Sequence, residues 1–116
     1  MAARRIAVVI GALAGPALVV LASWSQAAAG PSDVTVKLFQ FSPNRLEVTR
    51  GTAVTWTNHD DIRHTVTSGV PERRDAKFDA VLPAKGATAT VSFSEPGVYA
   101  YFCDRHQAMR GEIHVQ

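Results

Sequence analysis

The sequence lacks a pair of cysteines that could form a stabilising disulfide, and it lacks the linkers and repeats that divide longer chains into domains. It has one cysteine, Cys103, in 116 residues, so no disulfide can form within the chain. Residues 30–116 contain no low-complexity segment, internal repeat or linker, and no stretch with the pattern of a long helix. A chain of this length is enough for one domain. The sequence therefore predicts a single small domain, in which the lone cysteine needs an explanation.

An excess of charge of one sign is also missing. The chain has 12 Lys and Arg residues against 10 Asp and Glu residues, but Arg4 and Arg5 lie in a separate N-terminal segment. Residues 30–116 therefore balance 10 basic against 10 acidic side chains, with the histidines neutral. This balance gives no reason to expect nucleic acid as a partner.

The N-terminal segment has the pattern of a secretory signal. Arg4 and Arg5 precede the uncharged, apolar run Ile6–Ala22, and Ala27-Ala28-Ala29 follows. A positive start, an apolar run and a small-residue site are typical of cleaved signals. We expect residues 1–29 to be a secretory signal peptide, removed between Ala29 and Gly30. The remaining domain, residues 30–116, would be exported and periplasmic.

An uncleaved membrane anchor is the alternative for this segment. The apolar run has 17 residues, at the lower limit of the roughly 17–25 that a spanning helix needs. Gly11, Gly15 and Pro16 interrupt it, which favours cleavage. We therefore expect contact with a membrane only if the segment is retained. Arg4 and Arg5 could also mark twin-arginine export, although the residues around them fit that signal poorly.

The domain alternates apolar and polar residues in short runs that end at proline, glycine or asparagine. This pattern predicts an antiparallel sandwich or barrel, with strands at 34–39, 45–49, 53–57, 64–67, 88–94, 98–102 and 111–115. The charged stretch 69–85 departs from the pattern. We expect it to be a long connection, with at most a short helical turn or strand near Phe78.

Three side chains with metal-binding chemistry share one loop between the last two predicted strands. Cys103, His106 and Met109 are spaced three residues apart. Two imidazoles, one thiolate and a weak thioether ligand form the kind of site that cycles between Cu(I) and Cu(II). The loop supplies only one histidine. His64, 39 residues before Cys103, is the expected second one, and His59 is its rival.

Three segments of the domain resemble the cupredoxins, the blue copper proteins that include plastocyanin, pseudoazurin and amicyanin. They are residues 39–58, 64–66 and 99–111, and they occur in family order. The short Cys-x2-His-x2-Met loop is most similar to that of amicyanin. The resemblance implies an all-β Greek-key β-sandwich with one type 1 copper ion at one end.

The resemblance also implies the ligands and the function. His64, Cys103 and His106 would be the strong ligands, and Met109 the weak axial one. The protein would transfer single electrons, would not be an enzyme, and would act as a monomer. Redox partner proteins, an electron donor and an acceptor, would dock transiently near His106.

Two positions depart from the family pattern. Gln107 stands where the family often has a proline after the second histidine, a residue that helps to shape the loop and the apolar surface near the exposed histidine. Thr65 stands where plastocyanin and amicyanin have asparagine, a residue that ties the two ligand loops together. We expect the Thr65 hydroxyl to form that hydrogen bond instead.

Several other interpretations are weaker. The same ligands could serve a periplasmic copper carrier or storage protein with no role in electron transfer. A thiol hydrolase built on Cys103 would leave Met109 without a role, and the chain has no His-x-His motif of the kind that multicopper oxidases use. We expect His59 and His114 to be ordinary residues. Asp60 and Asp61 supply too few carboxylates for a calcium site, and we expect them to form a solvated turn.

Overall fold

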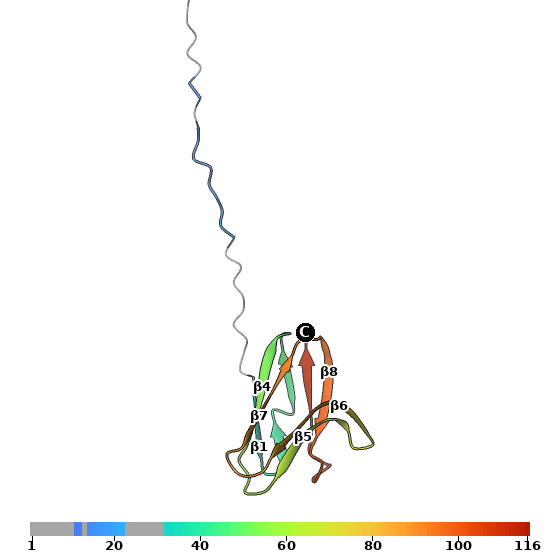
Figure 1. Cartoon of the computed structure of the whole chain (residues 1–116). Helices are drawn as coiled ribbons and strands as arrows, with labels where there is room; N and C mark the ends of the chain where they lie inside the picture. The colour runs from blue at the N-terminus through green and yellow to red at the C-terminus, as the bar shows by residue number, and fades with distance from the viewer. Residues whose placement is uncertain (1–10, 13, 23–31) are drawn as a thin grey trace, which may run out of the picture.

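The computed structural model describes residues 11–12, 14–22 and 32–116. Two β-sheets lie face to face, and the C-terminus lies at one end of the sandwich (Figure 1). The first sheet has the strand order β2-β1-β4-β7. Its strands are β1 (Asp33–Lys37), β2 (Gln40–Ser42), β4 (Thr52–Asn58) and β7 (Thr88–Phe93).

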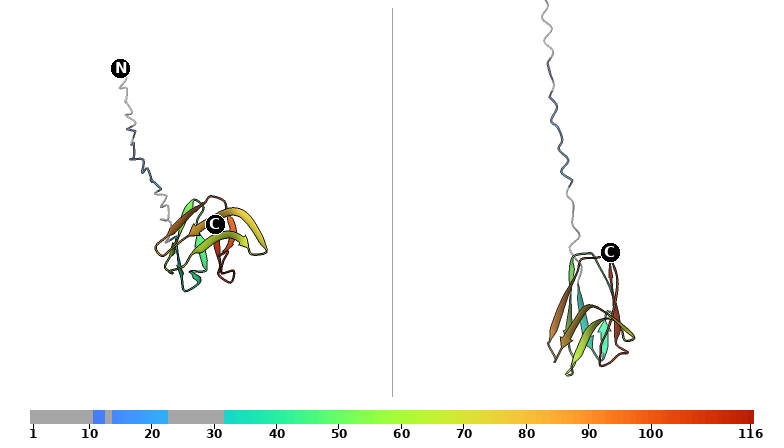
Figure 2. Two further views of the ribbon diagram at one scale, coloured as in Figure 1. Left: turned by 60° about the horizontal axis from the view of Figure 1, so that its bottom comes forward. Right: turned by 45° about the vertical axis from the view of Figure 1, so that its right-hand side comes forward.

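The second sheet has five strands in the order β3-β9-β8-β5-β6. Its strands are β3 (Arg45–Val48), β5 (His64–Val70), β6 (Arg73–Leu82), β8 (Gly97–Phe102) and β9 (Arg110–Val115). The described residues form no helix, and the all-β sandwich is therefore confirmed. The two layers are seen edge-on in the second view of Figure 2.

Two strand pairs differ from the antiparallel prediction. β1 pairs with β4, and β3 with β9, in parallel. Greek-key connections carry the chain from one sheet to the other between these strands. Neighbours in a sheet can then run in the same direction, which strand-by-strand alternation cannot reveal.

The N-terminal predictions fall mostly outside the described part of the chain. The expected cleavage point between Ala29 and Gly30 lies outside it. Residues 11–12 and 14–22 form neither helix nor strand. Among the described residues, no helix has the length and apolar character needed to cross a membrane.

Alternation along the strands builds the core between the sheets. In β4, Val54 and Trp56 are fully buried, whereas Ala53 is exposed and Thr55 and Thr57 are partly exposed. Burying each such large apolar side chain contributes about 1.5–3 kcal/mol. Each of the remaining strands except β3 also contributes core side chains that are less than 5% exposed. They include Val34, Val36, Phe41, Val66, Leu82, Phe93, Tyr101 and Ile113.

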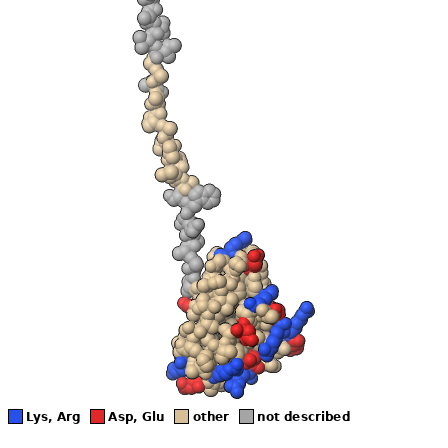
Figure 3. Space-filling model, in the orientation of Figure 1, with Lys and Arg blue, Asp and Glu red and all other residues tan. Residues whose placement is uncertain are grey.

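The largest correction concerns residues 69–85, which are not a connection. Most of them belong to the end of β5 and to β6, which has ten residues. Only Phe78, Ala80 and Leu82 alternate toward the interior. Because β6 is an edge strand, its other side chains can be charged and solvated, as edge strands often are. Figure 3 shows Lys, Arg, Asp and Glu side chains interspersed over one face of the sandwich.

A tight turn that the sequence did not predict separates β1 from β2. Leu38 and Phe39, assigned above to a strand, are its two central residues, with φ angles of 51° and 59°. Lys37 pairs with Gln40 across it. Such two-residue turns usually contain asparagine or glycine, and the left-handed conformation costs other residues about 1–2 kcal/mol each. The turn must therefore be held by other contacts.

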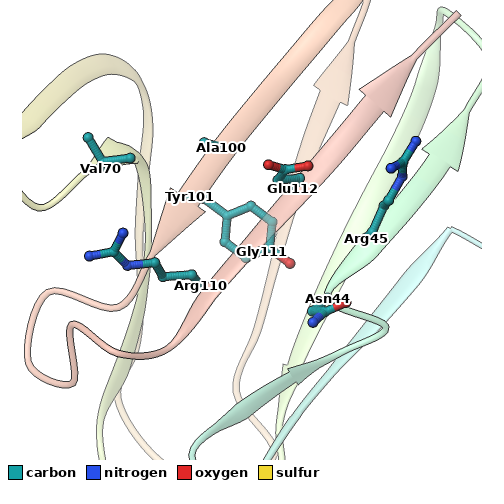
Figure 4. A pocket seen from close by; sticks show the side chains of 8 residues that line it. All are labelled: Asn44, Arg45, Val70, Ala100, Tyr101, Arg110, Gly111 and Glu112. Carbon is teal, nitrogen blue, oxygen red and sulfur yellow. The ribbon is translucent and has the colours of Figure 1, made fainter.

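Gly111 leaves room for an aromatic side chain of the core. It pairs with Tyr101 across β8 and β9, and the Tyr101 ring lies directly behind it (Figure 4). That ring packs edge-on against Phe41 and Trp56, with centroids 4.8 and 5.3 Å away. A Cβ atom on residue 111 would overlap the Cζ and Oη atoms of Tyr101. Only glycine fits this position while the ring keeps its place.

Three loops meet at the end of the sandwich opposite the C-terminus. They are the turn at 38–39, the loop 59–63 before β5, and the loop 103–109 between β8 and β9. β9 runs from this end toward the C-terminus, as Figures 1 and 2 show. The predicted ligands all belong to this end of the fold.

Candidate metal centre

The sandwich brings three of the four predicted ligands together. One donor atom each of His64, Cys103 and His106 lies within 4.8 Å of the other two. Cys103 Sγ is 3.7 Å from His64 Nδ1 and 3.8 Å from His106 Nδ1. His64 and Cys103 are fully buried, and His106 is partly exposed. Among the described residues, no other group of three His, Cys, Asp or Glu side chains is this close.

The pairing of β5 with β8 sets this geometry. Thr67 of β5 lies opposite Phe102 of β8, so His64, at the start of β5, reaches the same end as Cys103. The backbone N–H of Thr65 also donates a hydrogen bond to Cys103 Sγ, at 3.4 Å. The sulfur therefore has a fixed position between two neighbouring strands.

Backbone hydrogen bonds close the loop 103–109. The N–H of Cys103 donates to the carbonyl of Met109 at 3.1 Å, and the N–H of Met109 donates to the carbonyl of His106 at 2.8 Å. Met109 is 3% exposed. The loop thus holds all three of its predicted ligands at one end of the sandwich, and Met109 is buried there.

The Thr65 hydroxyl joins the two ligand loops, which confirms the expectation for this position. Its Oγ1 accepts a hydrogen bond from the N–H of Asp104 at 2.8 Å and is 2.9 Å from Thr67 Oγ1. Thr67 Oγ1 in turn donates to Asp79 Oδ1. Because the Thr67 proton is used there, Thr65 is the donor to Thr67. The chain of bonds runs from the loop after Cys103 to the edge strand β6.

Thr65→Val should loosen this junction without changing the volume of the side chain much. It leaves the N–H of Asp104 without its partner, and a buried group left unsatisfied costs about 1–3 kcal/mol. We expect the free energy of unfolding of the metal-free protein to fall by that amount, measured by denaturant titration. Thr55→Val is the control, because Thr55 bonds to Thr90 on an exposed face. Equal losses for the two variants would contradict the role of Thr65.

Asp60 contacts the remote nitrogen of His64, which sequence reasoning missed. Its Oδ2 is 2.8 Å from His64 Nε2, and its carboxylate also accepts hydrogen bonds from the N–H groups of Leu38 and Phe39. Burial would raise the pKa of Asp60, but these hydrogen bonds outweigh it and hold that pKa below its usual value. The only sequence signal was a carboxylate four residues before a predicted ligand.

Phe39 covers the two histidines from outside. Its ring is edge-on to His64, with centroids 5.7 Å apart, and to His106, with centroids 4.9 Å apart. Phe39 is itself 51% exposed, and its neighbour Leu38 is 74% exposed. The site therefore lies just beneath an apolar part of the surface.

The other histidines lie outside the cluster. His59 is exposed in the loop before β5. His114, on β9, has its Nε2 2.7 Å from Glu112 Oε2. Neither contributes a donor atom to the group formed by His64 and its neighbours.

The donor set fits copper. A thiolate and two imidazoles are the donors that copper sites of the electron-transfer type use, with a weak axial thioether. Structural zinc sites, by contrast, usually have four firm nitrogen or sulfur ligands, and here the fourth predicted ligand is the thioether of Met109. Cys103 is 0% exposed, which leaves its sulfur out of reach of a substrate.

Comparison with known proteins agrees with this chemistry. Residues 29–116 match the family described as copper binding proteins, plastocyanin/azurin family. Amicyanin-alpha of Methylorubrum extorquens is 31% identical over 93 residues, which are 78% of this chain and 76% of amicyanin-alpha. Plastocyanin of Scenedesmus fuscus is 34% identical, over 72% of this chain and all of the plastocyanin.

The solved structures that this chain resembles include cupredoxins. A purple cupredoxin from Nitrosopumilus maritimus superposes with a TM-score of 0.68 at 28% identity, covering 73% of this chain and 99% of that protein. A reduced amicyanin variant superposes with a TM-score of 0.63 at 27% identity, covering 78% and 87% of the two chains. The chain therefore belongs to the plastocyanin/azurin family of copper-binding proteins, the cupredoxins, and binds one copper ion.

Proposed function

We propose that His64, Cys103 and His106 hold the copper ion, with Met109 as a weak fourth ligand, and that the protein carries single electrons. The observation that supports this most is the gathering of one donor atom each of His64, Cys103 and His106 within 4.8 Å of one another at one end of the fold. Copper held there supplies a one-electron couple between Cu(I) and Cu(II).

The surroundings of the donors suit that role. Cys103 Sγ is fixed by the N–H of Thr65, and the loop that follows is closed by its own backbone hydrogen bonds. Donors placed in advance need little rearrangement when charge changes in the site. The burial of Cys103 argues against the thiol hydrolase alternative, and we propose no catalytic activity for the protein.

Partner proteins would dock over the loops that cover the site. Leu38, Phe39 and Ile62 are exposed apolar side chains on two of these loops, and Phe39 contacts the partly exposed His106. A small apolar surface of this kind suits the brief encounters of redox proteins. With the signal-like segment before residue 30, we propose that these partners are periplasmic.

Repeated redox cycling tests the proposed function. We expect the copper-loaded protein to pass through many cycles of reduction and reoxidation, in the presence of an external chelator, with its visible absorption fully recovered each time. Retention of copper by voltammetry and metal analysis would support an electron carrier. Transfer of the ion to the chelator in each reduced phase would overturn the proposal in favour of a copper carrier.

A further inference from the structure

One carboxylate connects the metal site to the strained turn beside it. Asp60 Oδ1 accepts a hydrogen bond from the N–H of Leu38 at 2.8 Å, and Oδ2 accepts one from the N–H of Phe39 at 3.2 Å. Oδ2 also lies 2.8 Å from Nε2 of His64. The residue thus bonds at once to a turn between β1 and β2 and to a fully buried histidine on β5.

The bonds to the turn offset an unfavourable backbone conformation. Leu38 and Phe39 both have positive φ, and neither is a residue that adopts this conformation readily. Their two N–H groups point to the same carboxylate. Asp60 therefore helps to hold the turn that places Phe39 edge-on to both histidines.

The bond to His64 decides which ring nitrogen carries the proton. An ionised carboxylate can only accept hydrogen bonds, so Nε2 must be the donor. In the neutral ring, Nδ1 then has a free lone pair. That atom is the one that lies 3.7 Å from Cys103 Sγ, on the side where the metal would bind.

We propose that Asp60 is a positioning residue, which fixes the tautomer and the orientation of His64 and couples them to the turn that carries Phe39. The inference rests on the proposed role of His64 as a ligand. A carboxylate bonded to the remote nitrogen also makes the imidazole a stronger donor. Asp60 should therefore favour Cu(II) over Cu(I).

Asp60→Asn tests this proposal, with Asp61→Asn as the matched control. The amide that replaces the Asp60 carboxylate would place its NH2 group against the N–H of Leu38 in one orientation, or against the N–H of Phe39 and the Nε2–H of His64 in the other. Asp61 is the neighbouring exposed carboxylate, so its replacement removes the same charge from the same loop. Both variants are made in the full chain and measured without metal and with copper.

The first measurement is nitrogen NMR of the histidine rings in the metal-free protein. We expect wild-type His64 to be protonated on Nε2 alone, and the ring in Asp60→Asn to populate both tautomers. Amide exchange at Leu38 and Phe39 should also become faster. This readout is independent of copper and of electron transfer, and a wild-type ring protonated on Nδ1 would overturn the proposal without any variant.

The second measurement is the affinity for Cu(II) and Cu(I) in competition with chelators. Loss of such a hydrogen bond to a metal-bound histidine typically lowers affinity about 10–100-fold. We expect that loss for Cu(II) in Asp60→Asn, a smaller loss for Cu(I), and wild-type values in Asp61→Asn. Equal losses in the two variants would mean that surface charge alone acts, and would overturn the proposal. If copper passes to the chelator during redox cycling but the His64 tautomer still depends on Asp60, the electron-transfer role is wrong and the positioning role of Asp60 stands.

Discussion

Replacing Cys103 with serine should abolish the intense visible absorption of the copper protein. In the proposed site that absorption comes from the Cys103 thiolate bonded to Cu(II), and a serine hydroxyl is a hard donor that stays protonated near neutral pH. Because Cys103 is the only cysteine, no other sulfur anion can replace it. We expect the affinity for copper to fall by more than the roughly 100-fold upper range for losing an outer hydrogen-bond partner.

The measurement is a Cu(II) titration followed by visible absorption and EPR. Wild-type protein should give a strong thiolate band and a narrow copper hyperfine splitting, and both should be lost in Cys103→Ser. His59→Ala is the control that should leave them unchanged, because His59 lies outside the cluster, and His64→Ala should remove them. A strong band in Cys103→Ser would contradict the ligand set. A pale wild-type spectrum would instead favour copper delivery over electron transfer.

Gly111→Ala should destabilise the whole fold. The added Cβ would overlap Cζ and Oη of Tyr101, whose ring is 1% exposed and packed between Phe41 and Trp56. Either the ring, β9 or the surrounding core must therefore shift. Overpacking of this kind costs about 1–3 kcal/mol, and sometimes more. Denaturant titration of the metal-free protein measures the loss.

Tyr101→Phe is the matched control for this prediction. It keeps the ring and removes Oη, a buried atom that has no hydrogen-bond partner among the described residues. Since no bond is broken, the free energy of unfolding should stay the same or rise. A Gly111→Ala protein as stable as wild type would show that β8 and β9 can separate enough to admit a methyl group, contrary to the packing seen here.

Much of the fold could be predicted because its strands alternate clearly. The sequence alone predicted β4, in which Val54 and Trp56 face inward, and β7. The candidate ligand loop could also be located, because Cys103, His106 and Met109 are spaced three residues apart between two strands. His64 was preferred to its rival His59 because Thr65 and Val66 follow it and because its position matches the family pattern, and the structure brings His64 to the cluster.

The features that were missed depend on contacts between distant residues. β6 looked like a connection because its charged side chains face solvent from a sheet edge, and edge position is a property of the assembled sheet. The turn at Leu38 and Phe39 has none of the usual turn residues, since it is held by Asp60, more than 20 residues away. The role of Asp60 was hidden for the same reason.

The position of β9 has a consequence for how the protein is made. β9 follows the other described strands in the chain, yet it lies inside its sheet, between β3 and β8. Until its residues have left the ribosome, the edges of β3 and β8 have no partner, and the second sheet stays in two pieces. Contacts between such distant segments also form slowly. The second sheet can therefore close only after β9 has been made, and the loop 103–109, which β9 anchors from one side, is completed by the same pairing.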